Sequence, residues 1–286
     1  MDRQTNGIAL TVGASLIWGT SFVAVSVGLQ YTNPYVLLFD RFLIASAVIL
    51  VLGVFTRSAR VWLELRKPRT WALAVVYALA FLLQFVGQDS SGASASAILS
   101  NLFVVFVPIV AFFVLQERLP NSSKVAVVLS IPGILLVFPS GLHMAGSVVG
   151  DLLLVGSSLG YTLFIVLGKK YGLTSLAGSF ALIVSMTVVL APLAALTGRP
   201  LLLGTMVPPS AWESVVWLGV PCTVVALAMY TRGLGSIRAT QSATLLLMEI
   251  MVGVALSVSL LGEVLGVSQV IGAMVIGASV IISSVR

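Results

Sequence analysis

Glu249 is the residue whose type and position most clearly indicate chemistry, because it is an acid within the long apolar run 238–262. If that run is a helix crossing a membrane, Glu249 lies roughly 16 Å along it at 1.5 Å per residue. This depth is close to the centre of a hydrocarbon layer about 30 Å thick, where a charge costs roughly 2.5–3.5 kcal/mol. Three roles are open: a proton-coupling carboxylate, a counter-ion for a cationic group of a substrate, or a structural partner of an arginine.

Asp40 and Arg41 form a second charged feature inside an apolar run, residues 35–55. Neighbouring residues on a helix point about 100° apart, so these two side chains do not pair well with each other. Arg41 can extend toward lipid headgroups, or it can face a cavity and balance Glu249 or Asp40. We interpret Asp40, Arg41 and Glu249 as coupling or gating candidates.

One face of the predicted helix over residues 70–88 has four polar or aromatic residues. Tyr77, Phe81, Gln84 and Gln88 follow steps of four, three and four. This stripe of amides and aromatic rings suits a small polar or zwitterionic solute that has an apolar part. The alternative is that the glutamines form hydrogen bonds between helices, worth about 0.6 kcal/mol each. We predict that all four residues line a substrate cavity.

Asn101, Trp18 and Tyr161 complete the candidate substrate-binding residues. Asn101 shares one face of the predicted helix 93–116 with Ser94 and Pro108, at intervals of seven. Trp18 and Tyr161 end two similar segments of the chain, and either ring could stack on a substrate. The alternative for both rings is packing against apolar neighbours.

Residues suited to enzymatic or metal chemistry are scarce in the sequence. Cys222 is the only cysteine and His143 the only histidine, which excludes an internal disulfide and Cys- or His-rich metal cages. The sequence has no Walker motif that would couple ATP hydrolysis, and no nucleophile–base or paired-carboxylate motif for a membrane-embedded enzyme. We expect no cofactor, no metal and no enzymatic activity.

Composition indicates that membrane-spanning helices position these residues. The chain is 59% hydrophobic and 8% charged, with a mean hydropathy of +1.13, whereas soluble domains have roughly 25% charged residues. Apolar stretches near the roughly 18-residue threshold for a spanning helix recur along the whole length. The predicted spans are 7–29, 35–55, 70–88, 93–116, 122–139, 149–168, 176–197, 211–231, 238–262 and 264–285.

Basic residues favour an even number of spans with both termini in the cytoplasm. When the spans alternate in direction, thirteen Lys and Arg residues fall on the cytoplasmic side, only Arg199 falls outside, and Arg41 lies within a span. This positive-inside bias is typical of a membrane protein. The net charge of +6 therefore does not indicate binding to nucleic acid.

Two internal similarities indicate a duplication. Residues 7–18 resemble 150–161, and residues 96–119 resemble 242–265 at their two ends, with offsets of 143 and 146 residues. Each half holds about five spans, and this odd number makes the second copy enter the membrane from the opposite side. The sequence predicts an all-α integral membrane protein with ten transmembrane helices in two inverted five-helix repeats, over residues 1–143 and 144–286. Many secondary transporters have inverted repeats with a substrate site between them.

The chain resembles the EamA family of the drug/metabolite transporter superfamily over essentially its full length. The motifs that match are WGTSFVAV at 18–25, Pro34, RFLIA at 41–45, QERL at 116–119, GDLL at 150–153, Met248-Glu249 and Gly262-Glu263. One departure is Ile250, where the family usually has proline. The resemblance implies ten helices in two inverted repeats, a bacterial or archaeal inner membrane, and export of amino acids or other small metabolites.

The leading hypothesis is a secondary active transporter that exports small metabolites, such as amino acids or their analogues, by alternating access across the cytoplasmic membrane. The alternative is a passive channel or a non-transporting membrane scaffold. The expected partners are a small-molecule substrate and the lipid bilayer, without nucleic acid, and a homodimer is compatible with the sequence.

Overall fold

The computed structural model describes residues 3–56, 59–117, 121–137, 147–172, 175–197, 208–261 and 267–284. Over these ranges the secondary structure is helical throughout, without a β-strand. The helices are α1 (Arg3–Gly19), α2 (Ser21–Leu29), α3 (Pro34–Thr56), α4 (Ala59–Leu65), α5 (Pro68–Ser91), α6 (Ala93–Leu99), η1 (Ser100–Leu102), α7 (Phe103–Leu115), α8 (Asn121–Val137), α9 (Val148–Lys170), α10 (Leu176–Thr197), α11 (Pro209–Gly219), η3 (Val220–Val225), α12 (Ala226–Leu234), α13 (Ala239–Leu245), α14 (Met248–Leu261) and α15 (Val267–Ser284).

Eight helical stretches within the described ranges are long and apolar enough to cross a membrane. They correspond to the first four predicted spans and to the sixth through the ninth. The fifth and tenth predicted spans correspond to α8 and α15, which pack against each other and are not among the eight. The chain is therefore an all-helical, multi-pass membrane protein.

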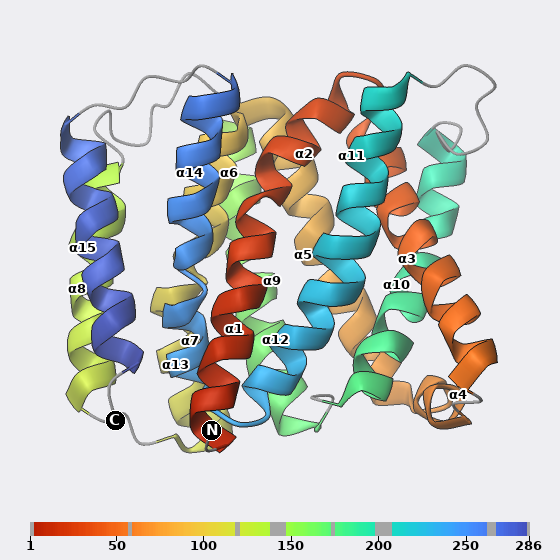
Figure 1. Cartoon of the computed structure of the whole chain (residues 1–286), viewed down its shortest axis with the longest axis horizontal. Helices are drawn as coiled ribbons and strands as arrows, with labels where there is room; N and C mark the ends of the chain where they lie inside the picture. The colour runs from red at the N-terminus through yellow and green to blue at the C-terminus, as the bar shows by residue number, and fades with distance from the viewer. Residues whose placement is uncertain are drawn as a thin grey trace.

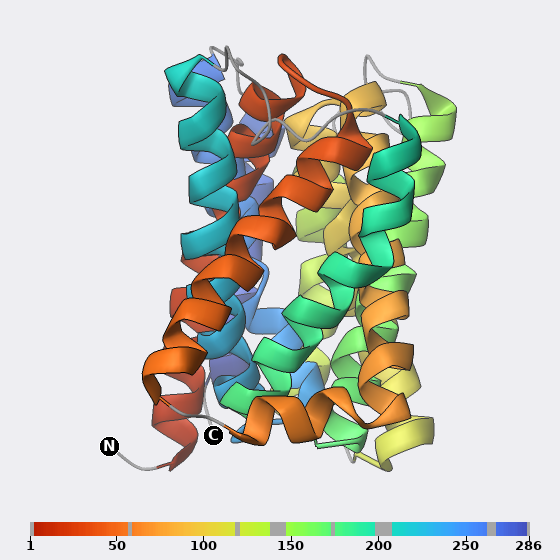
Figure 2. The ribbon, with the colours of Figure 1, turned by 90° about the vertical axis from the view of Figure 1, so that its right-hand side faces the viewer.

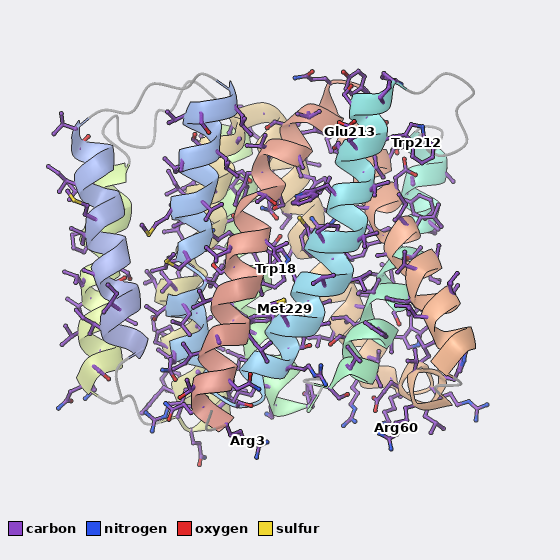
Figure 3. All side chains as sticks on the ribbon, in the orientation of Figure 1. Arg3, Trp18, Arg60, Trp212, Glu213 and Met229 are labelled. Carbon is purple, nitrogen blue, oxygen red and sulfur yellow. The ribbon has the colours of Figure 1, made fainter. Side chains whose placement is uncertain are left out.

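The long helices lie side by side and alternate in direction along the chain (Figure 1). We call the end where α1 begins and α15 ends the lower end, and the opposite end the upper end. The short helix α4 runs across the lower end instead of through the molecule (Figure 2). Arg3 and Arg60 lie at the lower end, whereas Trp212 and Glu213 lie at the upper end (Figure 3).

Four of the eight spans are interrupted along their length. Thr20 separates α1 from α2, the 3-10 turn η1 separates α6 from α7, the π-helical turn η3 separates α11 from α12, and Leu246-Leu247 separates α13 from α14. A break of this kind leaves backbone groups without their usual helical partners, which a membrane tolerates only where protein or a cavity surrounds them. We therefore expect a site in the interior of the bundle, near these four breaks.

Side chains near the breaks account for two of them. Ser100 and Asn101 each donate a side-chain hydrogen bond to the carbonyl four residues back, and bonds of this type bend helices. Pro221 has no backbone N–H, so a helical hydrogen bond is missing at the start of η3. The break between α13 and α14 forms even though Ile250 replaces the usual proline, so this chain does not need proline there.

The position of α9 against α5 depends on a glycine. A Cβ added to Gly160 would lie 2.6 Å from the Cβ of Ala80, which is closer than packed carbon atoms approach. The absence of a side chain at this position allows the two helices to approach closely. This contact brings Tyr161 of α9 beside Gln84 of α5.

Candidate functional site

A cavity of about 50 Å³ lies inside the bundle, and Trp18, part of its wall, is about midway between the two ends (Figure 3). At roughly 10–15 Å³ per water, this volume admits only a handful of water molecules. Both halves of the chain contribute to the wall. The lining residues are Trp18, Ser21, Arg41, Tyr77, Phe81, Gln84, Ser100, Asn101, Phe103, Tyr161, Phe164, Ile165, Tyr230, Leu246 and Glu249.

The structure brings most of the predicted site residues to this one cavity. The predicted residues in its wall are Trp18, Tyr77, Phe81, Gln84, Asn101, Tyr161 and Glu249, together with the gating candidate Arg41. Gln88 and Asp40 are buried but are not part of this wall. His143 and Glu263 lie outside the described residues.

Gln88 connects two helices instead of facing the cavity. Its Nε2 donates hydrogen bonds to the carbonyl oxygen of Phe22 at 2.8 Å and to Ser26 Oγ at 3.1 Å, which joins α5 to α2. The structure therefore places Gln88 between α5 and α2 and not in the wall of this cavity. The contact is of the alternative type, a hydrogen bond between helices.

Arg41 is 2% exposed, and its donors are held by the second half of the chain. Its Nε donates to Thr223 Oγ1 at 2.7 Å, and its Nη2 donates to the carbonyl oxygen of Cys222 at 3.3 Å. Its guanidinium carbon also lies 4.6 Å from the centre of the Phe81 ring, within range of a cation–π interaction. These contacts fix a guanidinium at the wall of the cavity.

The π-helical turn η3 explains how Cys222 and Thr223 can serve Arg41. In a π-helix the backbone hydrogen bonds skip one residue further than in an α-helix, and such turns are frequent at functional sites. The Cys222 carbonyl accepts from Arg41 and also from Trp18 Nε1, at 2.6 Å. Thr223 Oγ1 in turn donates to the Leu218 carbonyl, five residues back, at 2.7 Å. Sequence reasoning missed both residues, and Pro221 was the only local signal for this turn.

Glu249 lies in the first turn of α14, directly after the break. It is partly exposed within the cavity wall. The positive end of the α14 dipole favours a negative charge in this turn. Arg41 and Glu249 lie in the same wall, although no ion pair within 4.0 Å joins these two described residues. The cavity therefore presents a guanidinium group and a carboxyl group to a solute.

Aromatic rings form much of the remaining wall. Tyr77 stacks on Phe164 with ring centres 3.6 Å apart, and Phe81 meets Tyr161 edge to face at 5.4 Å. The Tyr161 hydroxyl donates to Gln84 Oε1, which orients both side chains. Phe164 and the other aromatic members Phe103 and Tyr230 were not predicted, although Phe164 lies one helical step of three residues from Tyr161.

Asn101 supplies an unused acceptor. Its Nδ2 donates to the Ala97 carbonyl at 2.7 Å, and its Oδ1 is buried without a hydrogen-bond partner among the described residues. Buried polar atoms are normally paired, so this oxygen is available to a donor on a bound solute. Within the described residues, no three His, Cys, Asp or Glu side chains are grouped closely enough to hold a metal ion.

Comparison with known proteins gives the family. The sequence pattern of the EamA-like transporter family matches residues 5–138 and again residues 148–285. An uncharacterized transporter of Archaeoglobus fulgidus is 29% identical over 252 residues, covering 82% of this chain and 81% of that protein. A probable amino-acid metabolite efflux pump of Salmonella typhimurium is 26% identical over 297 residues, covering 99% and 95%.

A solved structure, described only as the crystal structure of a protein, has the same fold as this chain. Its TM-score is 0.79 at 16% identity, and the similarity covers 98% of this chain and 96% of that one. Together with the two matches of the family pattern along the sequence, the helical membrane architecture leads to one conclusion. The chain belongs to the EamA-like transporter family.

Proposed function

We propose that this chain is a secondary active transporter that exports amino acids or closely related small metabolites by alternating access. The observation that carries the proposal is the cavity shared by both halves of the chain, with Arg41 and Glu249 in its wall. A guanidinium suits a carboxylate, and a carboxylate suits an ammonium group. An amino acid has both of these groups on one small molecule.

The remaining wall fits the same class of solute. Asn101 Oδ1 offers a second acceptor for an ammonium group, and the rings of Tyr77, Phe81 and Phe164 offer an apolar surface for a side chain. The Salmonella typhimurium relative, named as a probable amino-acid metabolite efflux pump, supports this substrate class and the export direction.

We further propose ten transmembrane helices in two inverted repeats, over residues 1–143 and 144–286, with α8 and α15 as the fifth and tenth. The family pattern matches each half once, which supports the duplication. The break at Ser100–Leu102 and the break at Leu246-Leu247 differ by about 146 residues, the same offset as the sequence similarity. The positive-inside bias supports an orientation in which the lower end, with both termini, faces the cytoplasm at the inner membrane.

Alternating access requires the walls of the cavity to separate, because the present volume of about 50 Å³ is too small for most amino acids. At the lower end, Glu117 Oε1 lies 3.1 Å from Lys169 Nζ and accepts a hydrogen bond from the Ala239 backbone N–H at 3.0 Å. These contacts join α7 of the first half to α9 and α13 of the second. Their separation would open a path from the cavity to the lower end.

Counterflow in liposomes tests the proposal directly. Purified protein in vesicles preloaded with an unlabelled amino acid should take up the same labelled amino acid in a saturable way. Glu249→Gln should abolish this exchange while the protein stays folded, and Glu213→Gln, which changes an exposed acid outside the cavity wall, should leave it intact. Unsaturable flux would indicate a channel, and no flux of any tested solute would indicate a scaffold.

Everted membrane vesicles, in a separate experiment, test proton coupling by Glu249. Uptake into everted vesicles should depend on an imposed pH gradient in the native protein. Uptake that still follows the pH gradient in Glu249→Gln would assign the coupling to another group.

A further inference from the structure

Helix α4 and the residues that follow it form a basic surface with apolar side chains at the lower end. Arg60, Arg66 and Arg69 are exposed, while Trp62 and Leu63 are 59% and 55% exposed. Helix α4 runs across the lower end of the molecule (Figure 2), and Arg60 lies at this end (Figure 3). These side chains face the surroundings of the bundle and not its core.

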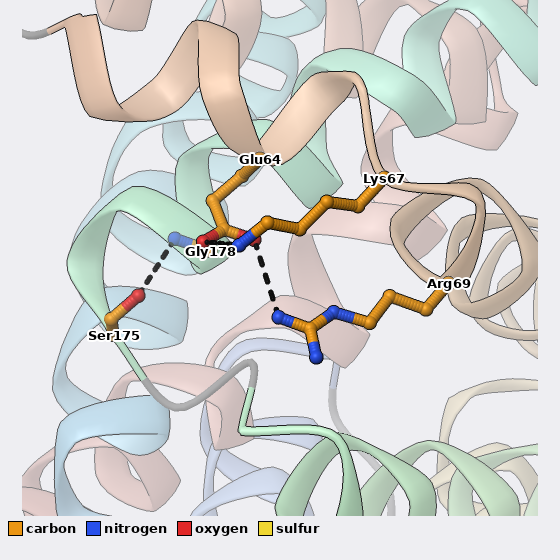
Figure 4. A network of polar contacts seen from close by, with 5 residues as sticks. All are labelled: Glu64, Lys67, Arg69, Ser175 and Gly178. Atoms are coloured by element: carbon orange, nitrogen blue, oxygen red, sulfur yellow. Dashed lines mark hydrogen bonds and ion pairs between the residues drawn. The ribbon is translucent and has the colours of Figure 1, made fainter.

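One acid neutralises part of this charge. Lys67 Nζ lies 2.6 Å from Glu64 Oε1, and Arg69 Nη2 lies 4.0 Å from Glu64 Oε2 (Figure 4). For Arg60 and Arg66, no ion pair within 4.0 Å exists among the described residues. Two guanidinium groups beside exposed apolar side chains are thus available to an anionic partner.

Local contacts hold the surface in a fixed position. Trp71 Nε1 donates to the Leu65 carbonyl at 2.7 Å, which attaches the end of α4 to the start of α5. On its inner side α4 packs against α10, near the point where the Gly178 N–H donates to Ser175 Oγ (Figure 4). An incoming partner therefore meets a preformed surface.

We propose that Arg60, Trp62, Leu63, Arg66 and Arg69 bind the headgroups of anionic phospholipids at the membrane interface. Trp residues are enriched at membrane–water interfaces, and Lys and Arg residues near the membrane surface attract anionic lipids. A nucleic acid would also attract the arginines, but it would not bury the apolar side chains of Trp62 and Leu63, which lie next to membrane-spanning helices. This inference does not depend on which solute the central cavity carries.

Quenching of Trp62 fluorescence by brominated lipids measures the preference of this surface for anionic over zwitterionic lipid. The protein is reconstituted in phosphatidylcholine vesicles that contain increasing fractions of brominated phosphatidylglycerol or, separately, brominated phosphatidylcholine. The Trp62 signal is the difference between the native protein and Trp62→Phe. At equal mole fraction, we expect brominated phosphatidylglycerol to quench Trp62 more strongly than brominated phosphatidylcholine. The ratio of the two lipid affinities should be about fivefold for each unpaired arginine.

The matched variants separate a specific surface from general basic charge at the lower end. Arg60→Gln with Arg66→Gln should make the two lipids equal quenchers, whereas Arg232→Gln, an exposed basic residue at the end of α12, should keep the native preference. Equal quenching by both lipids in the native protein would overturn the proposal. Absence of Trp62 quenching by either lipid would overturn it as well, because the surface would then lie outside the bilayer.

Discussion

At the scale of single residues, the charge of the cavity depends on how Arg41 is held. Two of its donors are occupied by Thr223 and by the Cys222 carbonyl, and Phe81 lies under the guanidinium. These contacts set the orientation of the whole guanidinium group of Arg41. Thr223 acts on a solute through Arg41, so we regard it as a positioning residue.

Replacement of Thr223 tests this role. Thr223→Val keeps the shape but removes the acceptor for Arg41 Nε, and it should reduce the free energy of unfolding by about 1–3 kcal/mol, since a buried donor is left unpaired. It should also weaken stabilisation of the protein by a transported amino acid in thermal unfolding. Thr223→Ser keeps the hydroxyl and should retain both properties. If the two variants behave alike, the hydroxyl does not position Arg41.

Helical periodicity defines one face of a helix, and it grouped Tyr77, Phe81 and Gln84, which line the cavity. The stripe from Tyr77 to Gln88 extends roughly 16 Å along α5 at 1.5 Å per residue. The cavity wall includes Tyr77, Phe81 and Gln84 of this stripe, whereas Gln88 bonds to Phe22 and Ser26 of α2. Periodicity gives the face of a helix but not the height at which a neighbouring helix covers it.

At the scale of elements, the contact of α9 with α5 sets one wall of the cavity. Gly160→Ala should destabilise the protein by about 1–3 kcal/mol, because the new methyl group would overlap Ala80. Gly168→Ala on the same helix is the matched control. Its added Cβ would lie 3.7 Å from Leu73, an ordinary contact, and alanine favours a helix by roughly 0.5–1 kcal/mol over glycine.

Thermal unfolding in detergent measures both glycine variants. We expect a lower midpoint for Gly160→Ala and an unchanged or higher one for Gly168→Ala. Equal midpoints would mean that α9 and α5 can move apart without cost, and the wall at Tyr161 and Gln84 would then not be fixed by this contact.

Helix positions were largely predictable from the sequence, and helix breaks were not. Apolar length alone placed the eight long spans close to their observed bounds. The break at Leu246-Leu247 has no proline or glycine to mark it, and Ile250 gave no indication of it. The break at η1 depends on how Ser100 and Asn101 turn back to their own helix, which tertiary packing decides.

At the scale of the whole molecule, contacts between the two halves join helices at the lower end, and we propose that they close it. Glu117 accepts from Lys169 and from Ala239, and Lys169 also donates to the Ile237 carbonyl. Lys169→Met should favour opening at this end by roughly fivefold, the effect of losing a partly exposed ion pair of about 1 kcal/mol. Lys170→Met, at the adjacent and exposed position, should have no effect.

The opening is measured as the rate at which a thiol reagent reaches the cavity. With Cys222→Ser as background, Ser100→Cys places one thiol in the cavity wall, where Ser100 is 2% exposed. Faster labelling from the lower end in Lys169→Met than in Lys170→Met would agree with the account. Equal rates would assign the closure to other contacts.

Labelling of the same thiol from each side of the membrane tests the central claim most directly. If the cavity is the site of alternating access, a membrane-impermeant thiol reagent should reach Ser100→Cys from the lower side and, in a separate reaction, from the upper side. A saturating amino acid that gives counterflow should slow both reactions. Access from one side only, under every condition and with or without solute, would contradict the account.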